Sequence, residues 1–206
     1  MKPVSLLPAG YIARGRLDLS QDKGLQVGLT LAGFGLFLVF GVLFLAAAAS
    51  LTPGLPSSGR VVLEPAGLLI LLVGALAVAL VVAVLHELTH AAVFWLVTHE
   101  WPVFGFRGLY AYAAAPKWYI PRLPYLLLGL APLLLLTLVG LALLPALPPS
   151  AVPAVVFALT INAAGAVGDL YLVFRLLLLP ATCLVHDEGN SVTWYVPAEN
   201  GRAAED

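Results

Sequence analysis

Five consecutive residues, His86-Glu87-Leu88-Thr89-His90, have the spacing of a metal-binding motif on a helix. Histidines four residues apart project from the same helix face, so their imidazoles can chelate one Zn²⁺ ion. Glu87 then lies next to the open coordination position, where its carboxylate can take a proton from a water molecule. The alternative is a pair of core histidines that only hydrogen-bond to neighbouring helices. We favour metal binding, because three polar side chains in an apolar run need a reason to be there.

The composition excludes an ordinary soluble domain. Mean hydropathy is +1.00, 61% of the 206 residues are hydrophobic and only 10% are charged, whereas soluble proteins carry about 25% charged residues. The formal net charge of -1 and the lack of a basic stripe give no sign of nucleic-acid binding. A single cysteine, Cys183, excludes an internal disulfide framework. We therefore expect one polytopic membrane domain in a lipid bilayer.

Four apolar runs are long enough to cross a bilayer as helices of about 20 residues. They extend over residues 25–51, 66–97, 123–147 and 151–179, and turn-forming prolines and glycines separate them. The sequence thus predicts an all-α membrane protein with about four transmembrane helices. We expect a cytoplasmic N-terminal segment (1–24), a four-helix domain (25–179) and a cytoplasmic tail (180–206) with a short strand at 192–196.

Basic residues predict the orientation of these helices, because positive charge stays on the cytoplasmic side. Most of them lie before the first run, between the second and third runs, or near the end of the fourth: Lys2, Arg14, Arg16, Lys23, Arg107, Lys117, Arg122 and Arg175. The other two connections hold only Arg60. Both termini are therefore expected to be cytoplasmic. High Leu, Ala, Gly and Pro with a single Met is typical of a GC-rich prokaryote, so we expect a prokaryotic cytoplasmic membrane.

A catalytic zinc site usually has three protein ligands and one water molecule, so two histidines are not enough. Asp169 in the fourth run is the only acidic residue of the apolar runs besides Glu87. At a rise of about 1.5 Å per residue, Asp169 and His90 lie at similar depths from the cytoplasmic helix ends. We favour metal ligation by Asp169 over a salt bridge to Arg175 or a helix-packing hydrogen bond, because a lone carboxylate there is destabilising.

Three further polar residues need an assignment. Asn162 precedes Asp169 by seven residues, which places the two on one face of a continuous helix. Asn162 could bind substrate or the reacting oxygen, or it could link two helices, and the sequence leaves both roles open. The remaining imidazoles, His99 and His186, lie at a helix end and in the tail, where we expect them at the interface or in solvent rather than on the metal.

The connection from Trp101 to Arg122 is rich in aromatic residues and has no helical period. It could form a short β-hairpin that enters the cytoplasmic face of the membrane. The free edge of such a hairpin could accept an extended substrate strand. The alternative is an aromatic belt that only holds the loop at the membrane surface, and the two interpretations do not exclude one another.

The motifs together resemble a family of mostly bacterial membrane proteins described as "putative zincin peptidases", which is distantly similar to the site-2 intramembrane metalloproteases. The resemblance covers the chain from about Ala66 to Tyr195. The matching residues are His86-Glu87-Leu88-Thr89-His90, Leu130-Ala131-Pro132 and Asn162-Ala163-Ala164-Gly165-Ala166-Val167-Gly168-Asp169.

This resemblance implies a zinc site made by His86, His90 and Asp169, with Glu87 as general base. One position departs from the site-2 pattern. Site-2 proteases usually carry a glycine directly after the third ligand, whereas Leu170 follows Asp169 in this chain.

The sequence therefore predicts an intramembrane zinc metalloprotease that cleaves membrane-associated proteins from the cytoplasmic side. The alternative is a non-catalytic metal-binding scaffold or chaperone in the membrane, but a purely structural zinc site has no need of a base such as Glu87. A metal-ion transporter is disfavoured, because the runs hold one compact polar cluster and no relay of acids and histidines across the bilayer.

Overall fold

The structure is a computed structural model that describes residues 1–18, 21–53, 64–107, 110–189 and 191–198. It divides into two compact units, each assembled from segments that lie far apart in the sequence. Unit 1 takes its described residues from 1–27, 87–131 and 169–206, and unit 2 takes its described residues from 28–86 and 132–168. The chain passes between the units inside helices rather than in loops.

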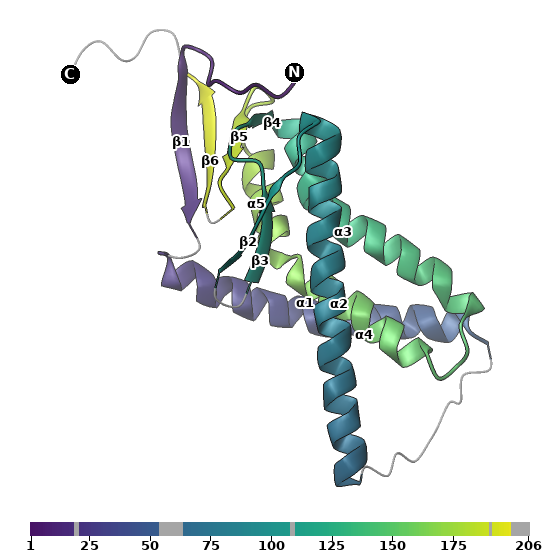
Figure 1. The fold of residues 1–206 in the computed structure, drawn as a ribbon. Helices are drawn as coiled ribbons and strands as arrows, with labels where there is room; N and C mark the ends of the chain where they lie inside the picture. Colours follow the sequence, from purple (N-terminus) through teal and green to yellow (C-terminus); the bar gives the residue numbers. More distant parts are fainter. Residues whose placement is uncertain (19–20, 54–63, 108–109, 190, 199–206) are drawn as a thin grey trace. The chain divides into compact units, whose positions relative to one another are not determined.

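Most of the described chain is helical (Figure 1). The α-helices are α1 (Lys23–Leu51), α2 (Pro65–Thr98), α3 (Arg122–Leu143), α4 (Val152–Gly165) and α5 (Val167–Leu177), and a short 3₁₀ helix, η1 (Leu144–Ala146), follows α3. Prolines lie in the first turns of α4 and η1, where the missing backbone N–H has no helical acceptor in any case. The helices therefore begin and end close to the bounds of the four expected apolar runs.

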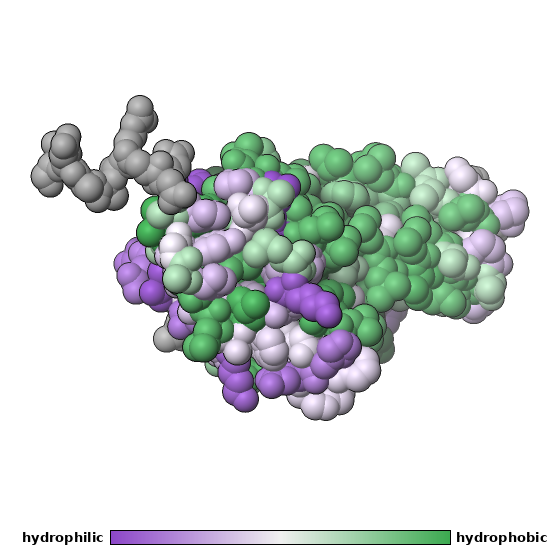
Figure 2. Space-filling view, turned by 90° about the horizontal axis from the view of Figure 1, so that it is seen from above, coloured by the Kyte–Doolittle hydropathy of each residue, from purple (hydrophilic) through white to green (hydrophobic). Residues whose placement is uncertain are grey.

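Three of these helices, α1, α2 and α3 continued by η1, are long and apolar enough to cross a membrane. The pair α4 and α5 makes a fourth if the two are one span, although a bend of 42° separates them. Large apolar side chains along α2 face outward, and only 6% of its most apolar window is buried. Figure 2 shows polar residues on one part of the visible face and a nearly unbroken apolar surface on the rest. Lipid is the solvent in which such a surface is stable.

In unit 2 an apolar cluster joins α1, η1 and α4. Phe44 and Ala48 of α1 pack in one buried group with Leu144 of η1 and with Val156 and Leu159 of α4. The α3 backbone approaches α4 closely as well, because a Cβ added to Gly140 would lie 2.4 Å from the Leu159 side chain. These contacts hold the α4 segment that carries Asn162.

Unit 1 contains a four-stranded antiparallel sheet with the order β1-β6-β5-β4. The strands are β1 (Tyr11–Asp18), β4 (Tyr119–Pro121), β5 (Leu184–Asp187) and β6 (Ser191–Pro197). This sheet departs from the expected all-α fold, because the N-terminal segment and the tail pair with each other instead of lying apart. The strand expected at 192–196 is confirmed as part of β6.

The expected hairpin in the connection after α2 is confirmed in unit 1. Strand β2 (Val103–Arg107) pairs antiparallel with β3 (Tyr110–Ala114), and Gly105 lies opposite Tyr112. The Tyr112 side chain covers Gly105, where an added Cβ would lie 2.3 Å from Tyr112, and it also meets Gly189 after β5, where the distance would be 2.1 Å. Tyr112 therefore links the hairpin to the four-stranded sheet.

An apolar core in unit 1 fixes three helices against the sheet. Phe94 of α2, Leu128 of α3 and Leu176 of α5 belong to one buried cluster with Ile120 of β4 and Val185 of β5. Close packing of these side chains holds the helices against the sheet. The cluster thereby sets the positions of the last turns of α2, the first turns of α3 and all of α5 after Gly168.

Gly189→Ala should destabilise the protein more than Gly10→Ala. Both glycines have a positive φ, +87° and +81°, a conformation that costs other residues about 1–3 kcal/mol. The added Cβ overlaps Tyr112 at Gly189 and meets nothing within 4 Å at Gly10. Thermal unfolding of both variants in detergent measures the difference. Equal losses would show that the Tyr112 ring moves aside freely and does not fix the hairpin.

Candidate metal centre

Helix α2 carries the first three residues of the site. His86 and Glu87 are neighbours on this uninterrupted helix, and His90 follows one turn later. His90 is buried, whereas His86 and Glu87 are partly exposed. The spacing of four residues turns both imidazoles to the same side, as the sequence predicts.

One ligand atom each of His86, His90 and Asp169 lies within 4.8 Å of the other two. His90 Nε2 and Asp169 Oδ1 lie 3.5 Å apart. Donor atoms on a tetrahedral zinc ion with bonds of about 2.1 Å lie about 3.4 Å apart. Two imidazole nitrogens and a carboxylate oxygen are also a donor set that suits zinc. These three side chains therefore fit the metal that the sequence predicts.

The backbone of α3 orients the His90 ring. Its Nδ1 lies 3.1 Å from the carbonyl oxygen of Leu128. A carbonyl can only accept a hydrogen bond, so we assign the proton to Nδ1. The lone pair then belongs to Nε2, the nitrogen that faces Asp169. His90 is thus held in the tautomer that can bind a metal ion.

Asn162 of α4 orients the His86 ring. Its side-chain nitrogen donates to the carbonyl of Pro132 at 3.1 Å, which leaves Oδ1 as the acceptor for His86 Nδ1 at 3.0 Å. The lone pair of His86 is therefore on Nε2. Of the two roles that the sequence left open for Asn162, the structure contains the helix-linking hydrogen bonds, and substrate binding by Asn162 stays a prediction.

Asp169 lies in the first turn of α5, where the positive end of the helix dipole stabilises a carboxylate. The sequence placed Asp169 and Asn162 on one face of a continuous helix, and this expectation is wrong, because α4 ends at Gly165 and α5 begins at Val167. The considered salt bridge to Arg175 is not the arrangement found. The Arg175 guanidinium lies over the Trp194 ring, 5.7 Å from its centre, and Asp169 faces His90.

Glu87 is held by the hairpin. The backbone N–H of Ala113 in β3 donates to Glu87 Oε2 at 3.0 Å. A hydrogen bond of this kind stabilises the ionised carboxylate, which is the form that a general base needs. No pattern in the sequence marks this partner, because a backbone N–H belongs to every non-proline residue.

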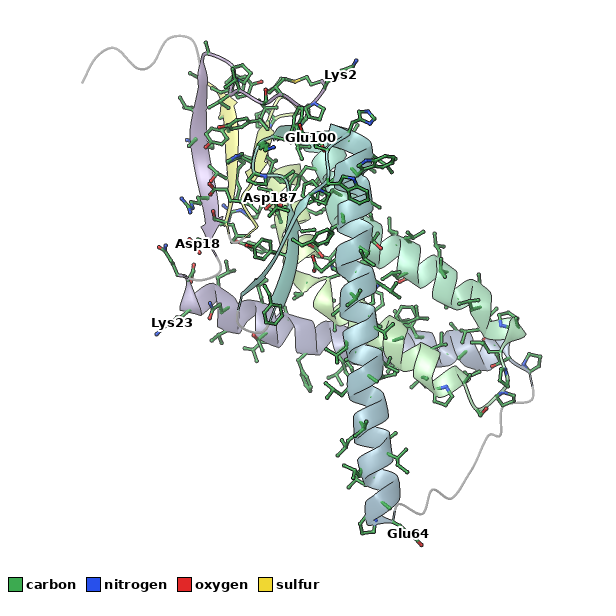
Figure 3. The ribbon with its side chains drawn as sticks, viewed as in Figure 1. Lys2, Asp18, Lys23, Glu64, Glu100 and Asp187 are labelled. Carbon is green, nitrogen blue, oxygen red and sulfur yellow. The ribbon has the colours of Figure 1, made fainter. Side chains whose placement is uncertain are left out.

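A buried acid lies near the site on the tail side of unit 1. Asp187, labelled in Figure 3, accepts hydrogen bonds from Tyr125 Oη at 2.6 Å and from the Gly189 N–H at 2.7 Å. Burial raises the pKa of the Asp187 carboxyl above its ordinary value, and these two hydrogen bonds act in the opposite direction. Sequence reasoning missed this pair, because Asp187 lies in a polar stretch where an exposed side chain is the default.

The other two histidines and the cysteine were not expected on the metal. His186 lies 2.8 Å from the Pro116 carbonyl and stacks on Tyr119, and His99 has a left-handed backbone (φ 56°) just after α2. Neither belongs to the cluster found among the described residues. Burial raises the pKa of the Cys183 thiol to about 11, so this cysteine is a neutral core residue.

The family described as "Putative zincin peptidase" matches residues 79–184, just over half of the chain. The matched segment contains the three candidate ligands, Glu87, Asn162 and the hairpin. No curated protein and no solved structure matches the chain. A zincin is a zinc-dependent peptidase, and the donor set found here suits that metal. By the extent of this match, the chain belongs to the "Putative zincin peptidase" family.

Proposed function

We propose that this protein is an intramembrane zinc metallopeptidase that hydrolyses peptide bonds of membrane-associated proteins. The observation that carries the proposal is the cluster of His86, His90 and Asp169, which lies beside a glutamate in helices apolar enough to span a membrane. The family supports the peptidase activity and zinc as the metal. The ordered partners of both imidazoles support a site built to bind a metal ion rather than a pair of core histidines.

His86, His90 and Asp169 would hold a zinc ion, which would supply a bound water of lowered pKa and polarise a peptide carbonyl. Glu87 is the residue that accepts a proton from the attacking water and returns it to the leaving nitrogen. The Ala113 N–H, which donates to Glu87 Oε2, holds the Glu87 carboxylate in position.

Strand β3 is the proposed docking edge for the substrate. Because the Ala113 N–H points to Glu87, this edge of the hairpin faces the proposed base. A peptide bond inside a membrane helix is shielded by the helix's own hydrogen bonds, so the substrate must unwind locally before cleavage. An extended segment that pairs along β3 regains backbone hydrogen bonds and brings its peptide bonds next to Glu87.

Purified wild-type protein should contain about one zinc ion per chain, and Asp169→Ala should lose most of it. Without the carboxylate only two imidazoles remain, too few for a stable site. Elemental mass spectrometry of the detergent-purified variants gives the metal content. Glu100→Ala, which removes an exposed carboxylate just after α2, is the control. Unchanged zinc in Asp169→Ala would remove Asp169 from the ligand set, and a zinc-free wild type after incubation with the metal would overturn the proposal.

Glu87→Gln should abolish cleavage while zinc and fold are retained. The amide has nearly the same shape but cannot take a proton, and loss of a general base lowers the rate about 10²–10⁴-fold. Mass spectrometry of protein N-termini in membranes from expressing cells should find new termini within hydrophobic segments for the wild type and for Glu100→Gln, but not for Glu87→Gln. The same new termini in Glu87→Gln membranes would disprove the proposed role of Glu87.

A further inference from the structure

Helix α3 contains a fully buried proline, Pro132, in its interior. Proline has no backbone N–H, so the carbonyl four residues earlier in the helix loses its helical partner. That carbonyl belongs to Leu128, and it is the one that lies 3.1 Å from His90 Nδ1. The acceptor that orients a candidate zinc ligand is therefore the group that the proline leaves unpaired.

This pairing satisfies both partners. Leu128 is buried, and a buried carbonyl without a hydrogen bond is destabilising, most of all where no water can reach it. His90 Nδ1–H supplies the missing bond and thereby keeps Nε2 for the metal. An alanine at position 132 would supply a backbone N–H in line with the Leu128 carbonyl, and that N–H would compete with the imidazole.

The carbonyl of the same proline supports the other imidazole. It accepts the hydrogen bond from the Asn162 side-chain nitrogen, which fixes the amide so that its oxygen faces His86 Nδ1. Asn162 is 2% exposed, so water has little access to replace either bond. Pro132 thus acts on the two histidines separately. Its missing N–H acts on His90, and its carbonyl acts on His86 through Asn162.

We propose that Pro132 is a positioning residue of the metal centre. Its missing N–H frees the Leu128 carbonyl to orient His90, and its carbonyl orients Asn162 and, through it, His86. In this role Pro132 acts through Leu128 and Asn162 and is not itself a ligand. The inference rests on the proposed zinc site and adds to it the reason why both imidazoles present Nε2. A proline that only bends α3 would not be coupled to zinc affinity in this way.

Pro132→Ala tests the missing donor alone, because alanine restores the N–H and keeps the carbonyl that Asn162 uses. The matched control is Pro124→Ala in the first turn of the same helix, where a restored N–H has no helical acceptor. Zinc affinity of the full-length protein in detergent, measured by competition with a chelator, should fall about 10–100-fold in Pro132→Ala and stay unchanged in Pro124→Ala. Thermal stability of the zinc-free protein should not fall in Pro132→Ala, since alanine favours the helix.

A fall in zinc affinity without a fall in zinc-free stability separates a positioning role of Pro132 from a purely structural role. Equal zinc affinity in Pro132→Ala and wild type would overturn the inference while leaving the zinc site intact. A parallel loss of zinc-free stability and zinc affinity would also overturn it. Failure of the wild type to bind zinc is a different result, which contradicts the proposed function itself.

A second measurement uses the wild type and does not depend on a folded variant. In zinc-loaded protein labelled with ¹⁵N-histidine, nitrogen NMR should find two imidazoles with a protonated Nδ1 and a metal-bound Nε2. Coordination through Nδ1 at either ligand would overturn the inference, since the Leu128 and Asn162 contacts would then be absent.

Discussion

In a bilayer, every polar atom of the candidate metal centre would need a partner from the protein, because hydrocarbon offers none. A regular helix has few groups to spare, since its carbonyls and N–H groups bond to one another. The structure obtains free groups where regular backbone is interrupted. Pro132 releases the Leu128 carbonyl inside α3, the break between α4 and α5 places Asp169 in the first turn of a new helix, and the edge of β3 provides the Ala113 N–H.

The strands also support the candidate site. The hairpin supplies a backbone hydrogen bond to Glu87, and Tyr112 fixes that hairpin against the turn after β5. The buried Asp187 of the same turn holds Tyr125 at the start of α3. The tail therefore contributes to the rigidity of α3 and of the hairpin, even though it carries no candidate ligand. A site that must place three ligands within a few tenths of an ångström needs such support.

Sequence reasoning predicted the features that a short stretch of residues indicates by itself. The four-residue spacing indicated His86 and His90 as candidate ligands, the scarcity of acids in apolar runs indicated Asp169, and the lack of helical period indicated the hairpin.

Sequence reasoning missed β1 because the partner strand lies at the other end of the chain, and pairing at that separation leaves no local trace. It also joined Asn162 to Asp169 in one helix, since nothing in the apolar run marks Ala166 strongly as a break. The orphan carbonyl of Leu128 could have been predicted, because a proline inside a span always frees the carbonyl four residues earlier. The boundaries at residues 24 and 180 stay predictions.

The four-stranded sheet bears on the number of membrane crossings between its strands. Strand β1 precedes α1, β4 lies between α2 and α3, and β6 follows α5, yet all three belong to the same sheet. If the candidate helices cross a bilayer, strands that pair with one another must lie on the same side of it, because strands cannot pair through hydrocarbon. An even number of crossings would then separate β1 from β4, and the two candidate spans α1 and α2 would provide it. The number of crossings from β4 to β6 would also have to be even. With α3 as one crossing, the bent pair α4 and α5 would be the other, and Asp169 would lie on a broken span rather than on a re-entrant loop.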